Sequence, residues 1–152
     1  MSNETQYTSQ QAHLHFAKSL NGRVWELLQA TERTVEEDAE MVHAAHASLY
    51  HWLQVGTGVH HQRGVWLISH IYAVLGDAVQ ALAYARRCLE LTKEHRVEMA
   101  DFDVAYAYEG MARALALSGD LEQAEAYRQQ AEAAGAAIMD DEAKAIFMGD
   151  LG

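Results

Sequence analysis

A short interruption of an otherwise helical pattern occurs twice in this chain, and it restricts what the rest of the sequence can form. The first interruption, LGD at residues 75–77, and the second, SGD at residues 118–120, each lie between two segments rich in apolar residues. In these segments the apolar residues recur every three or four positions, which is the spacing of one face of an α-helix. Two helices joined by a tight glycine turn form an antiparallel hairpin. The sequence therefore predicts a helical hairpin around each interruption.

The composition favours a single all-α domain over residues 1–152. The chain contains no proline, and 50% of its residues are hydrophobic. Proline inside a helix removes a backbone hydrogen bond and clashes with the preceding turn, so its absence permits long helices. Alanine, leucine, glutamate and glutamine, which are abundant here, are good helix formers. We expect only the polar residues 1–7 to be disordered.

The charge balance argues against nucleic acids and membranes as partners. With 22 acidic and 11 basic residues, the formal net charge is −11. Such a charge repels phosphate backbones and anionic membrane surfaces. The longest apolar run, at about residues 65–75, contains Ser69 and His70 and is much shorter than the roughly 20 residues of a membrane-spanning helix. A single cysteine, Cys88, cannot form an intrachain disulfide, so we expect a cytoplasmic protein.

The helical segments are predicted to pair into three antiparallel hairpins. The hairpins cover about residues 8–55, 59–95 and 100–135. A last short helix, over residues 140–148, is expected to cap the exposed end of the array. Open arrays of helical repeats need such terminal covers for solubility.

Several residues mark where the predicted helices begin and end. Thr34 followed by Glu37 fits a capping box, in which each side chain accepts a hydrogen bond from a free amide at the start of a helix. Asp77 and Asp120 are predicted N-caps of the helices that follow the two glycine turns. Gly56 is predicted to end the second helix in a left-handed conformation.

The apolar periodicity also predicts the buried faces of the first hairpin. In the first helix the predicted face consists of Phe16, Leu20, Val24, Leu27 and Leu28. In the second helix it consists of Val35, Ala39, Val42, Leu49 and Leu53.

Residues around the two glycine turns resemble the tetratricopeptide repeat, which places large, small, aromatic, glycine, alanine and alanine residues at six defined steps. The first copy has Ile68, Ser69, Tyr72, Gly76, Ala81 and Cys88, and the second has Met111, Ala112, Leu115, Gly119, Ala124 and Ala131. The copies are 43 residues apart, longer than the usual repeat of about 34, and both lack the terminal proline. Residues 47–91 and 102–120 also resemble small uncharacterised bacterial proteins of this repeat type. The resemblance implies a right-handed solenoid and no particular activity.

The same resemblance implies a binding surface. In such repeats the first helix of each hairpin lines a concave groove through its second, fifth and ninth positions. In this chain these positions hold Arg63, Trp66, His70, Tyr106, Glu109 and Arg113. Residues 63, 66 and 70 have the spacing of one helix face, and so do residues 106, 109 and 113. The implied ligand is a peptide or a partner helix, and the open ends of a short array also allow a homodimer.

Glu109 has more than one interpretation from sequence. It lies in an alanine- and tyrosine-rich run, where an unpaired carboxylate is costly to bury. Arg63 or Arg113 is the expected partner, in a structural ion pair that braces the helices at residues 59–75 and 100–118. The alternatives are a ligand-facing acid in the groove and a solvent-exposed side chain.

A histidine-metal site between the second and third helices is the competing hypothesis. Glu40 and His43 form one Glu-x-x-His step, and His46 and His51 follow on the same helix. Di-metal sites in helical bundles use this step twice, together with two further carboxylates, and only one copy occurs here.

Motifs of nucleophilic, zinc-peptidase, dithiol and phosphate-loop chemistry (GxSxG, HExxH, CxxC and the P-loop) do not occur in the sequence. We therefore expect no catalytic residues and no cofactor. The sequence predicts a non-catalytic binding or scaffolding module, with a metal-binding helical protein or enzyme as the alternative.

Overall fold

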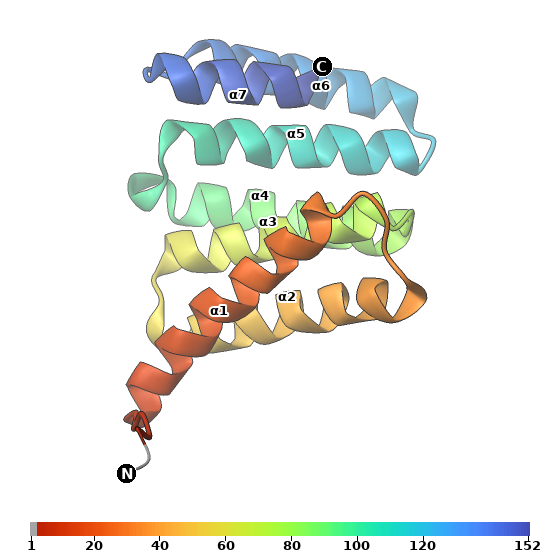
Figure 1. Cartoon of the computed structure of the whole chain (residues 1–152). Helices are drawn as coiled ribbons and strands as arrows, with labels where there is room; N and C mark the ends of the chain where they lie inside the picture. The colour runs from red at the N-terminus through yellow and green to blue at the C-terminus, as the bar shows by residue number, and fades with distance from the viewer. Residues whose placement is uncertain (1–2) are drawn as a thin grey trace.

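The computed structural model describes residues 3–152 and shows a succession of α-helices (Figure 1). They are α1 (Ser9–Gln29), α2 (Val35–Val55), α3 (Gly58–Val74), α4 (Ala78–Glu94), α5 (Asp101–Leu117), α6 (Leu121–Ala136) and α7 (Asp141–Leu151), with a 3-10 turn at Arg96–Glu98. This part of the chain contains no strand, which confirms the all-α prediction. Of the segment predicted to be disordered, residues 1–2 lie outside the described part, and residues 3–7 are exposed and non-helical.

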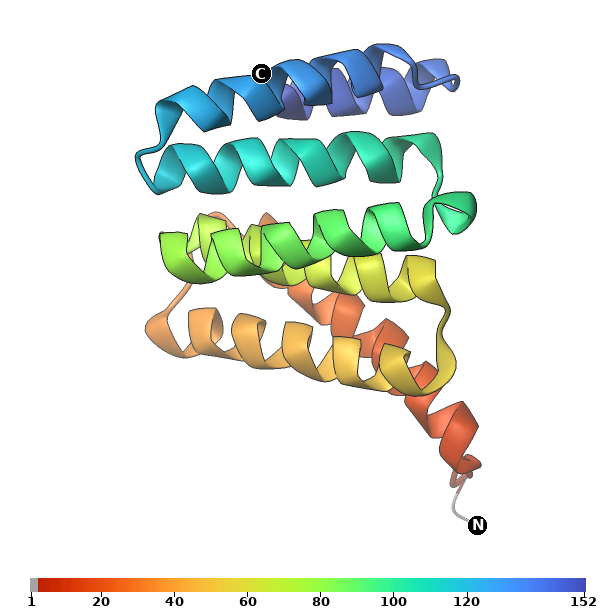
Figure 2. The ribbon, with the colours of Figure 1, turned by 180° about the vertical axis from the view of Figure 1, so that it is seen from behind.

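Each helix packs against its neighbours in the sequence, and α3 also contacts α5, as α5 contacts α7. The two opposite views show α2 to α7 as rows of nearly aligned helices, whereas α1 runs obliquely to the others (Figures 1 and 2). Within residues 3–152, none of the helices has the length and the hydropathy that spanning a membrane requires.

The two glycine turns have the same geometry. Gly76 and Gly119 have φ values of 82° and 88°, which a residue with a Cβ atom rarely adopts. After the first, the amide of Asp77 donates to the carbonyl of Tyr72 at 2.9 Å, and after the second the amide of Asp120 donates to Leu115 at 3.0 Å. A hydrogen bond from an amide to the carbonyl five residues before it, across a glycine with positive φ, is typical of the Schellman motif. Both α3 and α5 therefore end in the same way.

The predicted caps of α2, α4 and α6 are confirmed. Thr34 and Glu37 form both bonds of a capping box, and the side chains of Asp77 and Asp120 accept from amides in the first turns of α4 and α6. The prediction for Gly56 is wrong, because its φ of −90° and ψ of 179° are extended rather than left-handed. Only Gly56 and Thr57 separate α2 from α3, and an extended residue redirects the chain within that length.

The core runs through the whole stack of helices as three adjoining clusters. Met41, Ile68 and Ile71 are fully buried where α2 and α3 meet. Small residues, such as Ala81, dominate the cluster between α3, α4 and α5. Phe147 of α7 is fully buried in the last cluster against α5 and α6. The α7 helix thus covers α6, and it continues to Leu151, beyond the predicted end at residue 148.

The predicted buried faces of the first hairpin are only partly correct. Val24 and Leu27 are buried, but Phe16, Val35 and Leu53 are 45%, 81% and 53% exposed. At one point the two helices approach each other through small side chains, where the Ser48 hydroxyl donates to the carbonyl of Ala17 at 2.7 Å. Large apolar residues would hold the helices too far apart for that bond. The residues of α2 that are buried are Met41, Ala44, Ala45 and Ser48.

We expect Gly135→Ala to destabilise the protein by about 1–3 kcal/mol, because overpacking a tight contact forces its neighbours to move. A Cβ atom at this position of α6 would overlap the buried ring of Phe147. The matched control is Gly22→Ala in α1, where a Cβ atom meets nothing within 4 Å and alanine should stabilise the helix by about 0.5–1 kcal/mol. Urea unfolding of both variants measures these changes. Equal stability changes in the two variants would contradict the packing described for α7.

Candidate binding cleft

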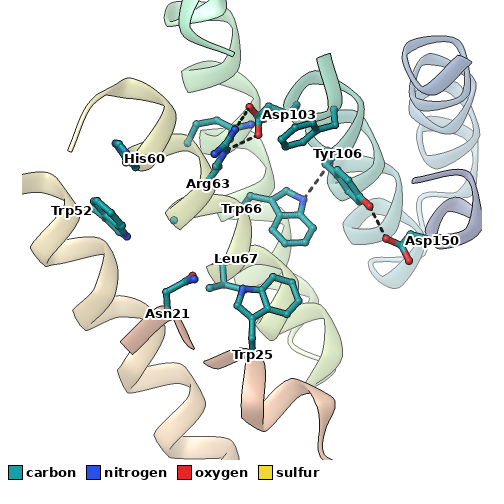
Figure 3. A pocket seen from close by; sticks show the side chains of 13 residues that line it. Asn21, Trp25, Trp52, His60, Arg63, Trp66, Leu67, Asp103, Tyr106 and Asp150 are labelled. Atoms are coloured by element: carbon teal, nitrogen blue, oxygen red, sulfur yellow. Dashed lines mark hydrogen bonds and ion pairs between the residues drawn. The ribbon is translucent and has the colours of Figure 1, made fainter. Parts of the chain in front are cut away.

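A cleft with a volume of about 510 Å³ opens between α1, α2, α3, α5 and the end of α7 (Figure 3). We call it the aromatic cleft and define it by Trp25 of α1, Trp52 of α2, Trp66 of α3, Tyr106 of α5 and Asp150 of α7. The chain contains three tryptophans, and all of them line this cleft. Its volume lies within the range of about 300–1,000 Å³ that is typical of ligand pockets.

The aromatic rings of the cleft are ordered by contacts with one another. Trp66 stacks on His70 with ring centroids 4.9 Å apart, and Trp25 stacks on Trp66 at 6.3 Å. The indole N–H of Trp66 donates to the main-chain carbonyl of Tyr106 at 3.2 Å, which fixes its orientation against α5. At the other end of the cleft, Trp52 stacks on His60 at 4.3 Å.

Arg63 and Asp103 form a two-bond ion pair on one wall of the cleft. Arg63 donates from Nε to Oδ1 at 2.8 Å and from Nη2 to Oδ2 at 2.9 Å. The Asp103 side chain is 4% exposed, whereas that of Arg63 is 49% exposed. The bonds to Asp103 raise the pKa of Arg63. Within residues 3–152 the Nη1 group of Arg63 bonds to no other side chain or carbonyl, so it remains available at the cleft.

A buried amide beneath this ion pair joins three helices. Gln62, which is 1% exposed, donates from Nε2 to the hydroxyl of Thr92 in α4 at 3.0 Å. The same nitrogen lies 3.3 Å from the carbonyl of Asp103 in α5. A buried polar group that finds partners in two other helices fixes their relative positions. Buried hydrogen bonds between α3, α4 and α5 therefore support this wall of the cleft.

Asp150 brings the last helix into the cleft. The hydroxyl of Tyr106 donates to its Oδ2 atom at 2.6 Å. Burial of the phenol, together with this bond and the negative charge of Asp150, raises the pKa of Tyr106. Within the described part of the chain, Asp150 forms no ion pair with a lysine, arginine or histidine.

Glu109, Arg113 and His70 form a closed cluster behind Trp66. Arg113 donates to the Oε1 atom of Glu109 from Nε at 2.9 Å and also from Nη2, and its Nη1 donates to Nδ1 of His70. Since Nδ1 of His70 accepts this bond, the ring is neutral with its proton on Nε2. Burial and the charge of Arg113 lower the pKa of His70 to about 4. Burial raises the pKa of Glu109, whose Oε2 atom has no partner within residues 3–152.

The structure thus divides the six predicted groove residues into two groups. Arg63, Trp66 and Tyr106 line the aromatic cleft. The other three form the closed cluster, of which Glu109 and Arg113 also border a second hollow of about 560 Å³. We call it the distal hollow; it lies between α5, α6 and α7, and its border also includes Glu125, Arg128 and Asp150.

The predicted brace involving Glu109 is partly wrong. Its partner is Arg113, four residues along the same helix, and the link to α3 passes through His70. The direct ion pair between α3 and α5 joins Arg63 to Asp103 instead. Asp103 was not predicted as this partner, because sequence spacing does not show which carboxylate faces Arg63.

The residues of the alternative metal site have separate partners. Glu40 accepts from Nε of Arg23 at 2.7 Å, and Nε2 of His46 lies 3.0 Å from the hydroxyl of Tyr72. His51 faces His13 of α1, with 2.8 Å between the two Nδ1 atoms, and His43 is exposed. Nowhere in residues 3–152 do three or more histidine, cysteine, aspartate or glutamate side chains form a group that could hold a metal ion. The structure therefore does not bring these four residues together as ligands.

Cys88 is buried in the core cluster of α3, α4 and α5. Burial raises the pKa of its thiol to about 12, so the side chain is a protonated thiol at neutral pH. It acts in packing rather than as a nucleophile, which requires the thiolate.

The chain was compared with protein-family models, curated proteins and solved structures, and it matches none of them.

Removing the charge of Asp103 should destabilise the protein. We expect Asp103→Asn to cost about 2–3 kcal/mol, since it leaves the half-exposed Arg63 without its buried partner. The control is Asp38→Asn, which breaks the pair with Arg33; this carboxylate is 37% exposed, against 4% for Asp103, and its loss should cost about 0–1 kcal/mol. Chemical unfolding at pH 7 compares the two, and a smaller loss in Asp103→Asn than in Asp38→Asn would be inconsistent with this role.

His70 should make the protein less stable in mild acid. The pKa of His70 is about 4 in the folded protein and about 6.5 in the unfolded chain. As the pH falls below about 6.5, the unfolded chain therefore binds a proton at His70 before the folded protein does. Stability due to neutral His70 is complete above pH 6.5 and is lost between about 6.5 and 4, by roughly 2–3 kcal/mol. The His70→Phe variant keeps a ring against Trp66 and should lack this part of the pH dependence. An NMR titration of the His70 ring with a midpoint near 6.5 would refute the assignment.

Proposed function

We propose that this protein is a non-catalytic binding module that holds a peptide segment or a partner helix in the aromatic cleft. The observation that carries the proposal is the presence of all three tryptophans in one open cleft. Tryptophans placed only to fill a core would be distributed among its clusters. Trp25, in contrast, is 37% exposed and presents its ring to the cleft.

The residue types of the cleft are those that contribute most to protein–protein interfaces. Tryptophan, tyrosine and arginine are enriched among the residues whose loss most weakens binding. Here Trp25, Trp66, Tyr106 and Arg63 line one concavity, and contacts with neighbouring helices hold the last three in place. A surface ordered before binding loses little side-chain entropy when the ligand binds, which favours affinity.

The dimensions also favour an extended ligand over a single small molecule. Asp150 borders both the aromatic cleft and the distal hollow, so the two concavities adjoin along α5 and α7. A peptide helix or strand could place successive side chains in the two hollows, which is how peptides dock in grooves.

We further propose that the helices form a tetratricopeptide-like right-handed solenoid. The identical turns at Gly76 and Gly119, 43 residues apart, support a structural repeat. The contact between α3 and α5 also supports the proposed solenoid. These are the first helices of the second and third pairs, and first helices line the groove in repeats of this type. The pairing of two copies of the chain through an exposed end is a variant of this proposal.

Selection of peptides from a random 12-residue display library tests the proposed function. We expect the selected peptides to bind the Trp25→Ala variant at least tenfold more weakly than the unaltered protein, because the variant loses one wall of the cleft. The control is Leu53→Ala, which removes an exposed apolar side chain of α2 that does not line the cleft and should leave affinity unchanged. Far-UV circular dichroism checks that both variants are folded. If no peptides are selected, or if they bind Trp25→Ala as tightly as the unaltered protein, peptide binding in the cleft is refuted.

A further inference from the structure

The basic side chains that border the two hollows already have partners. Arg63 is paired with Asp103, and Arg113 is paired with Glu109. Arg128 donates through its two Nη groups to the main-chain carbonyls of Leu151 and Gly152. Carboxylates thus neutralise two of these three positive charges, and the third, on Arg128, is held by hydrogen bonds to main-chain carbonyls.

The acidic side chains of the same surface are in excess. Asp150 borders both hollows and accepts only from the neutral hydroxyl of Tyr106. Glu125, on the border of the distal hollow, bonds only to the neutral amide of Gln129, at 3.4 Å. Neither carboxylate forms an ion pair with a basic residue anywhere in residues 3–152. The borders of the two hollows hold four carboxylates, Asp103, Glu109, Glu125 and Asp150, and three arginines, so this surface carries one excess negative charge. The whole chain is negative as well, with a formal net charge of −11.

The aromatic rings beside Asp150 suit a cation as well. Figure 3 shows the Asp150 carboxylate at one end of the cleft and Trp52 at the other, with the rings of Trp66 and Trp25 between them. The face of an indole ring attracts lysine and arginine cations, and arginine also stacks on it. The apolar stem of such a side chain can lie along the rings while its charged end reaches the carboxylate.

We propose that the partner peptide is anchored by an arginine or lysine side chain that lies against Trp25 and Trp66 and pairs with Asp150. This inference rests on the proposed function and names the chemistry of its ligand. Arg63 does not oppose it, because Asp103 neutralises the guanidinium charge. Its free Nη1 group can donate to a main-chain carbonyl of the same peptide. The negative field of the protein speeds the encounter with a basic segment.

The experiment uses the peptides selected from the display library, a neutral version of each peptide, and one matched pair of protein variants. Asp150→Asn removes the charge and keeps an oxygen that can accept from Tyr106. Glu142→Gln removes one charge from the exposed first turn of the same helix, away from both hollows. A neutral version of each peptide is synthesised, in which the recurring basic residue is replaced. Citrulline replaces an arginine, and norleucine replaces a lysine. Dissociation constants are measured at 150 mM salt.

We expect a recurring basic residue in the selected peptides. Asp150→Asn and the neutral peptide should each weaken binding at least tenfold, and the two changes together should weaken it little more than either alone, because both break the same contact. Glu142→Gln should change affinity less than twofold.

Three results would overturn the inference. Peptides that need Trp25 but share no basic residue would leave the proposed function standing and refute the cationic anchor. An affinity unchanged by Asp150→Asn would also refute the cationic anchor. If Glu142→Gln weakens binding as much as Asp150→Asn, the basic residue is attracted by the acidic surface in general and not by this site. A failure to select any peptide that depends on Trp25 refutes the proposed function itself.

Discussion

The carboxylate of Asp103 is the group on which the rest of the binding surface depends. It is 4% exposed, accepts both bonds of Arg63, and also accepts from the amide of Ala100 at 2.9 Å, which starts α5. One side chain therefore sets the position of α5 along α3 and the orientation of the guanidinium at the cleft. Because Trp66 and Tyr106 lie one turn further along these two helices, the bond between them follows from the same alignment. The cleft is thus a consequence of how α3 and α5 are joined.

The sequence predicted the helices well because their ends carry local chemical signals. Thr34 with Glu37, Asp77, Gly76, Asp120 and Gly119 each act on amides or carbonyls within a few residues, and such effects do not depend on the tertiary structure. The buried faces of α1 and α2 were harder to predict. Large apolar residues such as Val35 and Leu53 matched the helical period but lie on the outside. Besides large residues such as Val24 and Met41, the contact uses Ala17 and Ser48, which are small enough to let the helices approach closely. Periodicity in hydrophobicity does not detect small size.

About half of the candidate site could be predicted, and the division has a structural cause. Arg63, Trp66 and Tyr106 lie on the helices that resemble the tetratricopeptide repeat in sequence, so their common orientation was implied by that resemblance. Trp25 and Asp150 lie on α1 and α7, outside that repeat. The oblique direction of α1 and the extension of α7 to Leu151 are results of tertiary packing, and no local pattern indicates them. His70, Glu109 and Arg113 were expected at the groove, but they bond to one another behind Trp66 because burial makes unpaired charges costly.

The close packing of Phe147 against Gly135 also has a consequence for the groove. Asp150 follows Phe147 by three residues, so the ring that holds α7 on α6 also holds the carboxylate beside Tyr106. If α7 detached, the groove would lose the carboxylate of Asp150, and the hydroxyl of Tyr106 would lose its acceptor, whereas the three tryptophans lie on α1, α2 and α3. The terminal helix therefore both covers the hydrophobic core and supplies the carboxylate shared by the two hollows, which couples the integrity of this end of the helical stack to what the groove can select.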